Sequence, residues 1–230
     1  MKILTVAKID QNNVLSDEVM RVSQYPSSPA SIATELGGLA MKFARVERIP
    51  RYDEKTREND AEHSFMLSLV ATELASELYG EEMNSGLITQ YAMVHDLIEV
   101  KTGDVATFHY DANDMAAKHA TEQAALEELL NELPPYTAQL LRDYEDQKTP
   151  ESRFVKAVDK LLPVIVDILG CGKKVMKEDY GVTNIVDLKK SYLKLHNRIA
   201  TSFAEFPQIV EAHELLCELF AIEFDITQKR

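Results

Sequence analysis

Side chains that bind metals and move protons are concentrated in one ten-residue segment, HDLIEVKTGD. On a helix, His95 and Glu99 are four residues apart and project from the same face, which Asp96 also borders. Gly103 allows a sharp turn after that helix, and the turn brings Asp104 back toward the same pocket. One helix would thus supply two metal ligands and a base. This arrangement is typical of metal-assisted hydrolysis.

Acids and histidines on an amphipathic helix are usually solvated, but the neighbours of this pair are apolar. We therefore expect His95 and Asp96 to lie in or beside a core, where an unpaired charge is costly. A metal ion would supply the partner that a buried carboxylate needs. The apolar neighbours are Tyr91, Ala92, Val94, Leu97, Ile98 and Val100.

A mononuclear site needs about two further ligands, which should come from other helices. His63 shares one side of a predicted helix with apolar residues, and Asn59 or Asp60 can cap that helix. Asp159 lies in a second apolar stripe, RFVKAVDKLLPVIVDIL. Taken alone, His63 also fits a core histidine, and Asp159 fits a surface acid or an ion pair with Lys160.

The order of His63, His95-Asp96 and Asp159 resembles the HD superfamily of metal-dependent phosphohydrolases, which is named after the adjacent pair. The segments AEHS, HDLIEVKTGD and KAVDK are similar to the short, single-domain branch typified by the bacterial 5'-deoxynucleotidases. The resemblance spans about residues 30–170.

Metal binding and water activation are the first roles that this resemblance implies. His63, His95, Asp96 and Asp159 would bind one divalent transition metal, and Glu99 would orient or deprotonate water. A mixed nitrogen and oxygen ligand set suits Mn, Co, Fe, Ni or Zn and does not choose among them.

The resemblance also implies substrate contacts. Arg48-Ile49-Pro50 falls where the deoxynucleotidase branch has Arg-Trp-Pro, so Arg48 would clamp the phosphate, unless it is an ordinary surface arginine. Asp104, the second candidate catalytic acid, would accept a hydrogen bond from a sugar hydroxyl, and Thr107 would contact the nucleotide. Because Ile49 replaces tryptophan, we expect a weaker preference for deoxyribose.

The periodicity of apolar residues is helical almost throughout and predicts an all-α, single-domain HD-type bundle. We expect an N-terminal leader over 1–28 that holds a short strand or arm, an HD core over 29–175, and C-terminal helices over 176–230. The surplus apolar surface of those last helices predicts a homodimer. The amphipathic stretches lie near residues 29–45, 60–79, 84–100, 113–132, 135–147, 150–170, 184–203 and 207–226.

Composition excludes several partners. The net charge of -13 over 230 residues would repel polymeric nucleic acid. No apolar run approaches the length of a membrane helix, so we expect no membrane partner. Cys171 and Cys217 lack a CxxC spacing, so thiols in a reducing compartment, the cytoplasm, are expected.

The leading hypothesis is hydrolysis of a nucleoside 5'-monophosphate to nucleoside and phosphate. A nucleoside triphosphate triphosphohydrolase is the alternative, although a triphosphate calls for more basic residues than the evident Arg48, Arg51, Arg57 and Lys101. A di-iron oxygenase of the HD type is less favoured because no second histidine follows His119 before Asp159. A non-catalytic nucleotide-binding protein would not need the acids at 99 and 104.

Overall fold

The computed structural model describes residues 28–105, 108 and 112–228. It divides into two compact units, Met1–Met41 and Lys42–Arg230. Helix α2 (Pro29–Phe43) is the described element of the first unit and extends into the second. The N-terminal strand or arm predicted for the leader lies outside the described residues.

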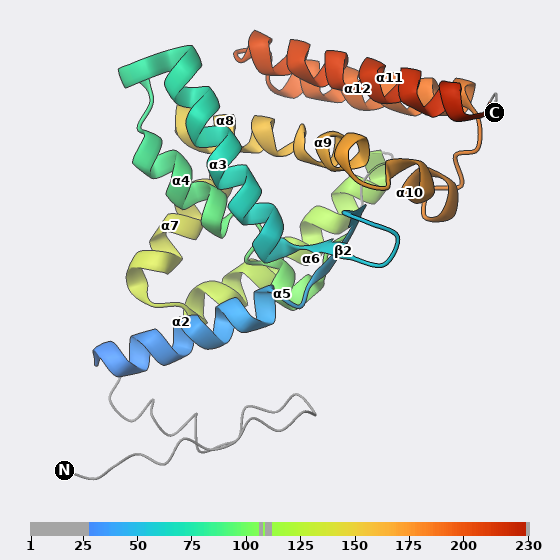
Figure 1. Cartoon of the computed structure of the whole chain (residues 1–230). Coiled ribbons are helices and arrows are strands. Elements are labelled where there is room, and N and C mark those ends of the chain that lie inside the picture. The colour runs from blue at the N-terminus through green and yellow to red at the C-terminus, as the bar shows by residue number, and fades with distance from the viewer. Residues whose placement is uncertain (1–27, 106–107, 109–111, 229–230) are drawn as a thin grey trace. The chain divides into compact units, whose positions relative to one another are not determined.

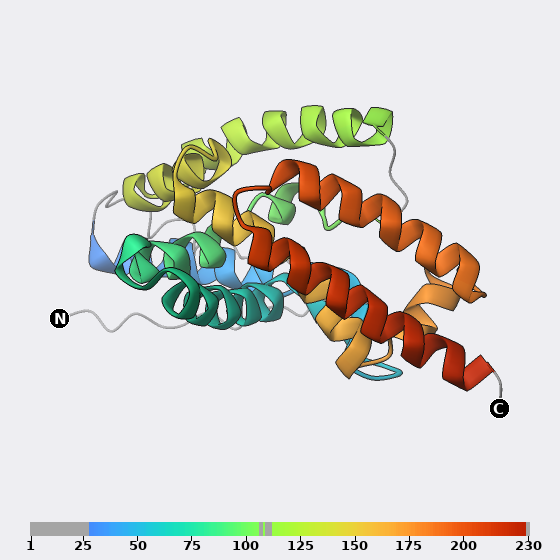
Figure 2. The same cartoon turned by 90° about the horizontal axis from the view of Figure 1, so that it is seen from above.

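The second unit is built almost entirely of helices, which confirms the all-α prediction (Figures 1 and 2). Helix α3 packs on α4 and α8, and α12 packs on α11, α9 and α8. The described helices of this unit are α3 (Asp60–Tyr79), η2 (Gly80–Glu82), α4 (Ser85–Val94), α5 (Glu99–Thr102), α6 (Ala112–Glu132), α7 (Pro135–Glu145), α8 (Pro150–Asp159), α9 (Leu162–Leu169), α10 (Gly172–Glu178), α11 (Ile185–Ser202) and α12 (Pro207–Gln228).

A small antiparallel hairpin precedes α3. Strand β1 (Glu47–Arg51) pairs with β2 (Arg57–Asn59), with Glu47 opposite Asn59 and Arg51 opposite Arg57. The Arg-Ile-Pro motif therefore lies on a strand, which helical periodicity did not predict. The second strand leads directly into α3, so the hairpin fixes where that helix begins.

Helix α3 begins with a capping box. The Asn59 side chain accepts from the backbone N–H groups of Ala61 and Glu62, and the Glu62 carboxylate accepts from the Asn59 N–H. Such a pair satisfies N–H groups that the first turn leaves free. His63 follows immediately, so its position is set by a well-anchored helix start.

The prediction of one continuous helix over 84–100 is wrong. Helix α4 ends at Val94, residues 95–98 form a turn, and α5 begins at Glu99. In the turn, backbone N–H groups bond three residues back, as from Glu99 to Asp96 at 2.8 Å. Three-residue spacing changes the angle between successive side chains. His95 and Glu99 therefore come from two elements, which share no common helix face.

The predicted stretch 150–170 also consists of two helices. Helix α8 ends at Asp159, and α9 begins at Leu162 with Pro163 in its first turn. Proline lacks an N–H, and its ring clashes with the carbonyl four residues earlier, which here belongs to Asp159. Pro163 thus places Asp159 at the end of a helix.

Two buried apolar clusters hold the helices in place. The first includes Leu67 of α3 and Phe154 of α8. The second includes Met176 of α10 and Phe220 of α12. Helix α10 was not predicted, because it is short and follows the glycines of the GCG segment. In the described part of the chain, no helix is long and apolar enough to span a membrane.

Candidate active site

Four potential ligand atoms converge although they come from distant parts of the sequence. His63 Nε2 lies 2.9 Å from Asp159 Oδ1 and 3.9 Å from Asp96 Oδ2. His95 Nε2 lies 2.9 Å from Asp96 Oδ2 and 3.9 Å from Asp159 Oδ1. Atoms that bind one transition metal at about 2.1 Å are roughly 3 to 3.5 Å apart. The observed separations bracket that range, and one atom each from His63, His95 and Asp96 lies within 4.8 Å of the other two, a group that does not include Asp159.

Three elements deliver these ligands. His63 comes from the first turn of α3, His95 and Asp96 come from the turn after α4, and Asp159 is the last residue of α8. Both carboxylates thus lie where a helix stops, and the breaks that periodicity missed are the positions of ligands.

The two histidines are oriented by partners on their other ring nitrogens. His95 Nδ1 donates to the Ala92 carbonyl at 2.8 Å, which leaves Nε2 without its proton in the neutral ring. Glu58 Oε2 lies 3.4 Å from His63 Nδ1 and is completely buried. Partners of this kind fix the tautomer of metal-binding histidines.

The residues at this centre fit a divalent metal ion. His95 Nε2 is buried and, although it lies 2.9 Å from Asp96 Oδ2, has no hydrogen bond of suitable geometry among the described residues. Burial and Arg48 disfavour a charged His63, but bonds to Asp159 and Glu58 raise its pKa to about 9. The negative charges of Asp159 and Glu58 therefore favour a cation at this ring, either a proton or a metal ion.

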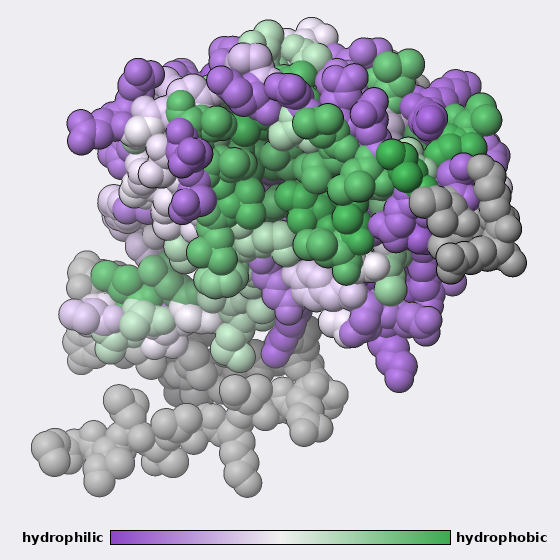
Figure 3. Space-filling model, turned by 45° about the horizontal axis from the view of Figure 1, so that its top comes forward, coloured by the Kyte–Doolittle hydropathy of each residue, from purple (hydrophilic) through white to green (hydrophobic). Residues whose placement is uncertain are grey.

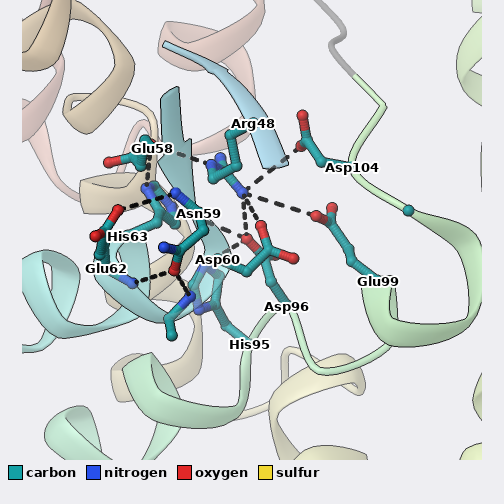
Figure 4. A network of polar contacts seen from close by, with 12 residues as sticks. Arg48, Glu58, Asn59, Asp60, Glu62, His63, His95, Asp96, Glu99 and Asp104 are labelled. Atoms are coloured by element: carbon teal, nitrogen blue, oxygen red, sulfur yellow. Dashed lines mark hydrogen bonds and ion pairs between the residues drawn. The ribbon is translucent and has the colours of Figure 1, made fainter. Parts of the chain in front are cut away.

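Arg48 lies at the centre of a second set of acids (Figure 4). Its side chain is 10% exposed, and its Nη1 lies 2.9 Å from Asp96 Oδ2 and 3.2 Å from Asp60 Oδ1. The same nitrogen lies 3.8 Å from Glu99 and 3.6 Å from Asp104. The guanidinium thus forms ion pairs with carboxylates. Its contact with a substrate phosphate stays a prediction.

This guanidinium also bears on how many metals the site holds. Oxygen atoms of Asp60, Asp96 and Glu99 lie within 4.8 Å of one another, a spacing that would also suit an ion. Arg48 Nη1 is close to all three, and therefore already provides a positive charge there. The histidine cluster has no arginine within its ligand set, and the prediction of one metal stays a prediction.

Glu99 is a buried acid beside that cluster. It is 5% exposed, and its Oε2 has no hydrogen-bond partner among the described residues. Burial, followed by the charges of Asp96, Asp104 and Asp60, raises the pKa of Glu99 to about 11. A divalent cation nearby favours the ionised carboxylate instead. Glu99 is thus able to take a proton when the ligand cluster is charged.

A cavity of about 640 Å³ opens onto the site and is large enough for a nucleotide. Arg48, Ile49, Glu99 and Asp104 line it, whereas Thr107 lies outside the described residues. His119 is exposed and also lines the cavity.

The cavity has basic groups that the sequence did not single out. Lys156 and Arg198 line it without any sign in the sequence, and so does Lys160, which was considered only as an ion-pair partner of Asp159 and does form that pair. Of the other basic residues considered from the sequence, Arg51 and Arg57 pair with Asp179, and Lys101 pairs with Glu128 and Glu132. Glu58 and Asp60, which hold Arg48, were likewise not predicted.

The sequence model of the HD domain family matches residues 41–200, which covers the whole ligand cluster. The chain belongs to the HD domain family. A crystal structure of a predicted metal-dependent phosphohydrolase from Magnetospirillum magnetotacticum MS-1 has the same fold, with a TM-score of 0.66 and 25% identity over 87% of this chain and 96% of that one.

Two curated relatives of this HD protein are 5'-deoxynucleotidases, as the motifs predicted. The 5'-deoxynucleotidase HDDC2 of Xenopus laevis is 31% identical over 55% of this chain and 61% of its own length. The 5'-deoxynucleotidase YfbR of Escherichia coli is 31% identical over 50% of this chain and 62% of its own length. The chain thus spans about three fifths of these relatives. Family and ligand cluster together indicate a divalent metal.

Removing one ligand should empty the centre. We expect Asp96→Ala to weaken metal binding at least about 100-fold, because a ligand contributes more than the outer groups that orient it. Metal content of the purified protein, measured by mass spectrometry, checks this, with circular dichroism as the test of folding. The control is Asp104→Ala, which also removes a partner of Arg48 but should keep one equivalent of metal per chain. Full occupancy in Asp96→Ala would show that the ligand set is wrong.

Proposed function

We propose that this HD protein hydrolyses nucleoside 5'-monophosphates to a nucleoside and inorganic phosphate. The observation that carries the proposal is the buried acid Glu99 beside the four-ligand cluster, within a cavity of nucleotide size. The 5'-deoxynucleotidase relatives support the substrate class.

The residues divide the reaction between them. His63, His95, Asp96 and Asp159 would hold a metal ion, which when bound would supply Lewis-acid polarisation of a phosphoryl oxygen and favour ionisation of water. Glu99 takes a proton from the attacking water, whose oxygen forms the new bond to phosphorus. The bond to the 5' oxygen breaks, and that oxygen takes a proton from solvent as the nucleoside leaves. Arg48 positions Asp96 and Glu99, and Asp104 accepts a hydrogen bond from a sugar hydroxyl.

The finer features of the substrate and cofactor also belong to this proposal. The cofactor is one ion of Mn, Co, Fe, Ni or Zn, since imidazole and carboxylate accept all of these. Ile49 lines the cavity in the place of the tryptophan of related enzymes, so ribose and deoxyribose are both accepted. The site of action is the cytoplasm, where Cys171 and Cys217 remain the free thiols seen here.

A triphosphohydrolase is the second candidate because the cavity is more basic than the sequence suggested. Lys156, Lys160 and Arg198 join Arg48 on its wall. Lys160 pairs with Asp159 at 2.5 Å, and burial lowers the pKa of Lys156. Both effects reduce the positive charge that the two lysines offer to a longer phosphate chain, so the monophosphate remains the leading substrate.

A panel of ribo- and deoxyribonucleoside mono-, di- and triphosphates separates the two candidates. The protein is stripped of metal, reloaded with Mn, Co, Mg or Zn in turn, and assayed for the phosphate product. We expect orthophosphate from monophosphates of both sugars. Tripolyphosphate from triphosphates would establish the second candidate, and no product with any metal would contradict both.

The role of Glu99 is tested by Glu99→Gln. This change keeps the shape of the side chain and removes its ability to accept a proton, so turnover should fall about 100-fold or more while metal content stays the same. The matched control is Glu77→Gln, which alters an exposed acid of α3 outside the cavity. Unchanged turnover in Glu99→Gln would rule out Glu99 as the base.

We also propose a homodimer, formed through an exposed apolar face of α3 and α12. Phe65 and Leu69 of α3 are 67% and 59% exposed. Leu215, Leu219 and Ile222 form a stripe along α12 and are 58%, 52% and 60% exposed. Figure 3 shows hydrophobic residues gathered in a broad area on the face drawn there. Large apolar areas of this kind favour association.

A charge within that stripe should separate the subunits. Wild-type protein is expected at twice the 26.0 kDa mass of the chain in light scattering at micromolar concentration. Leu219→Glu should give the mass of one chain, because a carboxylate buried without a partner in the interface opposes association. Leu193→Glu, on α11, is the control and should remain dimeric. A monomeric wild-type protein would refute the dimer.

A further inference from the structure

One cavity residue has no part in the mechanism above. Asp167 of α9 is 7% exposed, and its Oδ1 has no hydrogen-bond partner among the described residues. Its side chain nevertheless lines the same cavity as the metal ligands. Burial, followed by the charge of Glu58, raises the pKa of Asp167 to about 7.

An acid in this position does not stabilise the fold. A buried carboxyl without a partner costs free energy, whether it is ionised or neutral. The chain is nonetheless shaped around it. A Cβ on Gly172 would lie 2.4 to 2.5 Å from Asp167 backbone and Cβ atoms, so this glycine is needed for the close approach of α10. The backbone of Asp167 is therefore fixed against α10, while Oδ1 has no hydrogen-bond partner in the described part of the chain.

The surroundings of Asp167 suit a flat aromatic ligand. Phe108, Tyr180 and Tyr192 line the cavity and contact one another, with ring centroids 4.6 Å apart for Phe108–Tyr180 and 6.0 Å apart for Phe108–Tyr192. Burial and the charge of Asp167 both raise the pKa of the two tyrosines, so Asp167 is close to them. The Tyr192 hydroxyl is also buried, with no hydrogen-bond partner in the part of the chain that the structure describes. Aromatic side chains of this kind can stack on the faces of a nucleotide base, while the polar groups beside them can form hydrogen bonds with its edge.

Asp167 lies on α9, the helix that follows the candidate ligand Asp159, and both residues line the same cavity. Tyr180 lies near both Asp167 and the site residue Asp104, since both charges raise its pKa. A phosphate at the ligand cluster would therefore place its base toward Asp167.

We propose that Asp167 determines base specificity by accepting hydrogen bonds from the N1–H and 2-amino groups of guanine. This inference rests on the proposed nucleotidase function. Guanine presents two adjacent donors, which match the two oxygens of a carboxylate. Adenine and cytosine present a donor beside an acceptor, and thymine presents one donor between two acceptors. Among these bases, only guanine offers adjacent donors to both oxygens of an ionised Asp167, of which Oδ1 has no hydrogen-bond partner among the described residues.

The test compares wild type with Asp167→Asn at pH 8, where the wild-type carboxylate is ionised. Binding of deoxyguanosine, deoxyadenosine and thymidine is measured by calorimetry, and kcat/KM is measured for the corresponding monophosphates. Asparagine offers one acceptor and one donor, which suits adenine and opposes guanine. We expect wild type to favour guanine and the variant to lose about 10- to 100-fold for guanine relative to adenine. Asp187→Asn, an exposed change on α11, should keep the wild-type preference.

The two readouts separate this inference from the proposed function. No hydrolysis together with guanine-selective binding that Asp167→Asn abolishes would contradict the nucleotidase function and support base recognition. Equal use of all bases by wild type, or an unchanged guanine preference in the variant, would overturn the role of Asp167. Thermal unfolding without ligand gives a further check. A lower midpoint in Asp167→Asn would show that the carboxyl has a structural partner and would also overturn it.

Discussion

The structure of the site depends on the balance between buried acids and a few positive charges. Asp60, Asp96, Glu99 and Asp104 surround Arg48, and Asp96 also faces the two histidines. Without these cations, so many carboxylates could not remain together in a poorly solvated space. Asp96 belongs to both groups. Burial opposes its ionisation, but His95 and Arg48 outweigh that effect and lower its pKa.

The β-hairpin makes this balance possible. Strand β1 places Arg48 among the acids, and β2 places Glu58 between Arg48 and His63. The removal of either side of such a buried ion pair costs more than the pair contributes, because it leaves the other charge without a partner. The hairpin is therefore a structural part of the site, although it supplies none of the four metal ligands.

The candidate ligands could be identified in the sequence because each combines a distinctive residue type with apolar neighbours. His63, His95-Asp96 and Asp159 need only that combination and their order along the chain. The helix boundaries at the ligands were harder to predict, since the apolar pattern continues through Val94 and Leu161 while the hydrogen bonding changes. Pro163 was the available signal for one break. Lys156, Arg198 and Asp167 face the cavity because of tertiary packing, which periodicity along one helix does not reveal.

The ligand geometry has a consequence for the folding of the chain. His63 and Asp159, whose side chains meet directly, are separated by 96 positions in the sequence. A metal ion bound by both residues would act as a reversible cross-link that closes a long loop of the chain, and long loops are costly to close by packing alone. Binding to the folded state adds its free energy to folding. Cellular metal supply would then govern how long each molecule escapes proteolysis, and so how much of it accumulates.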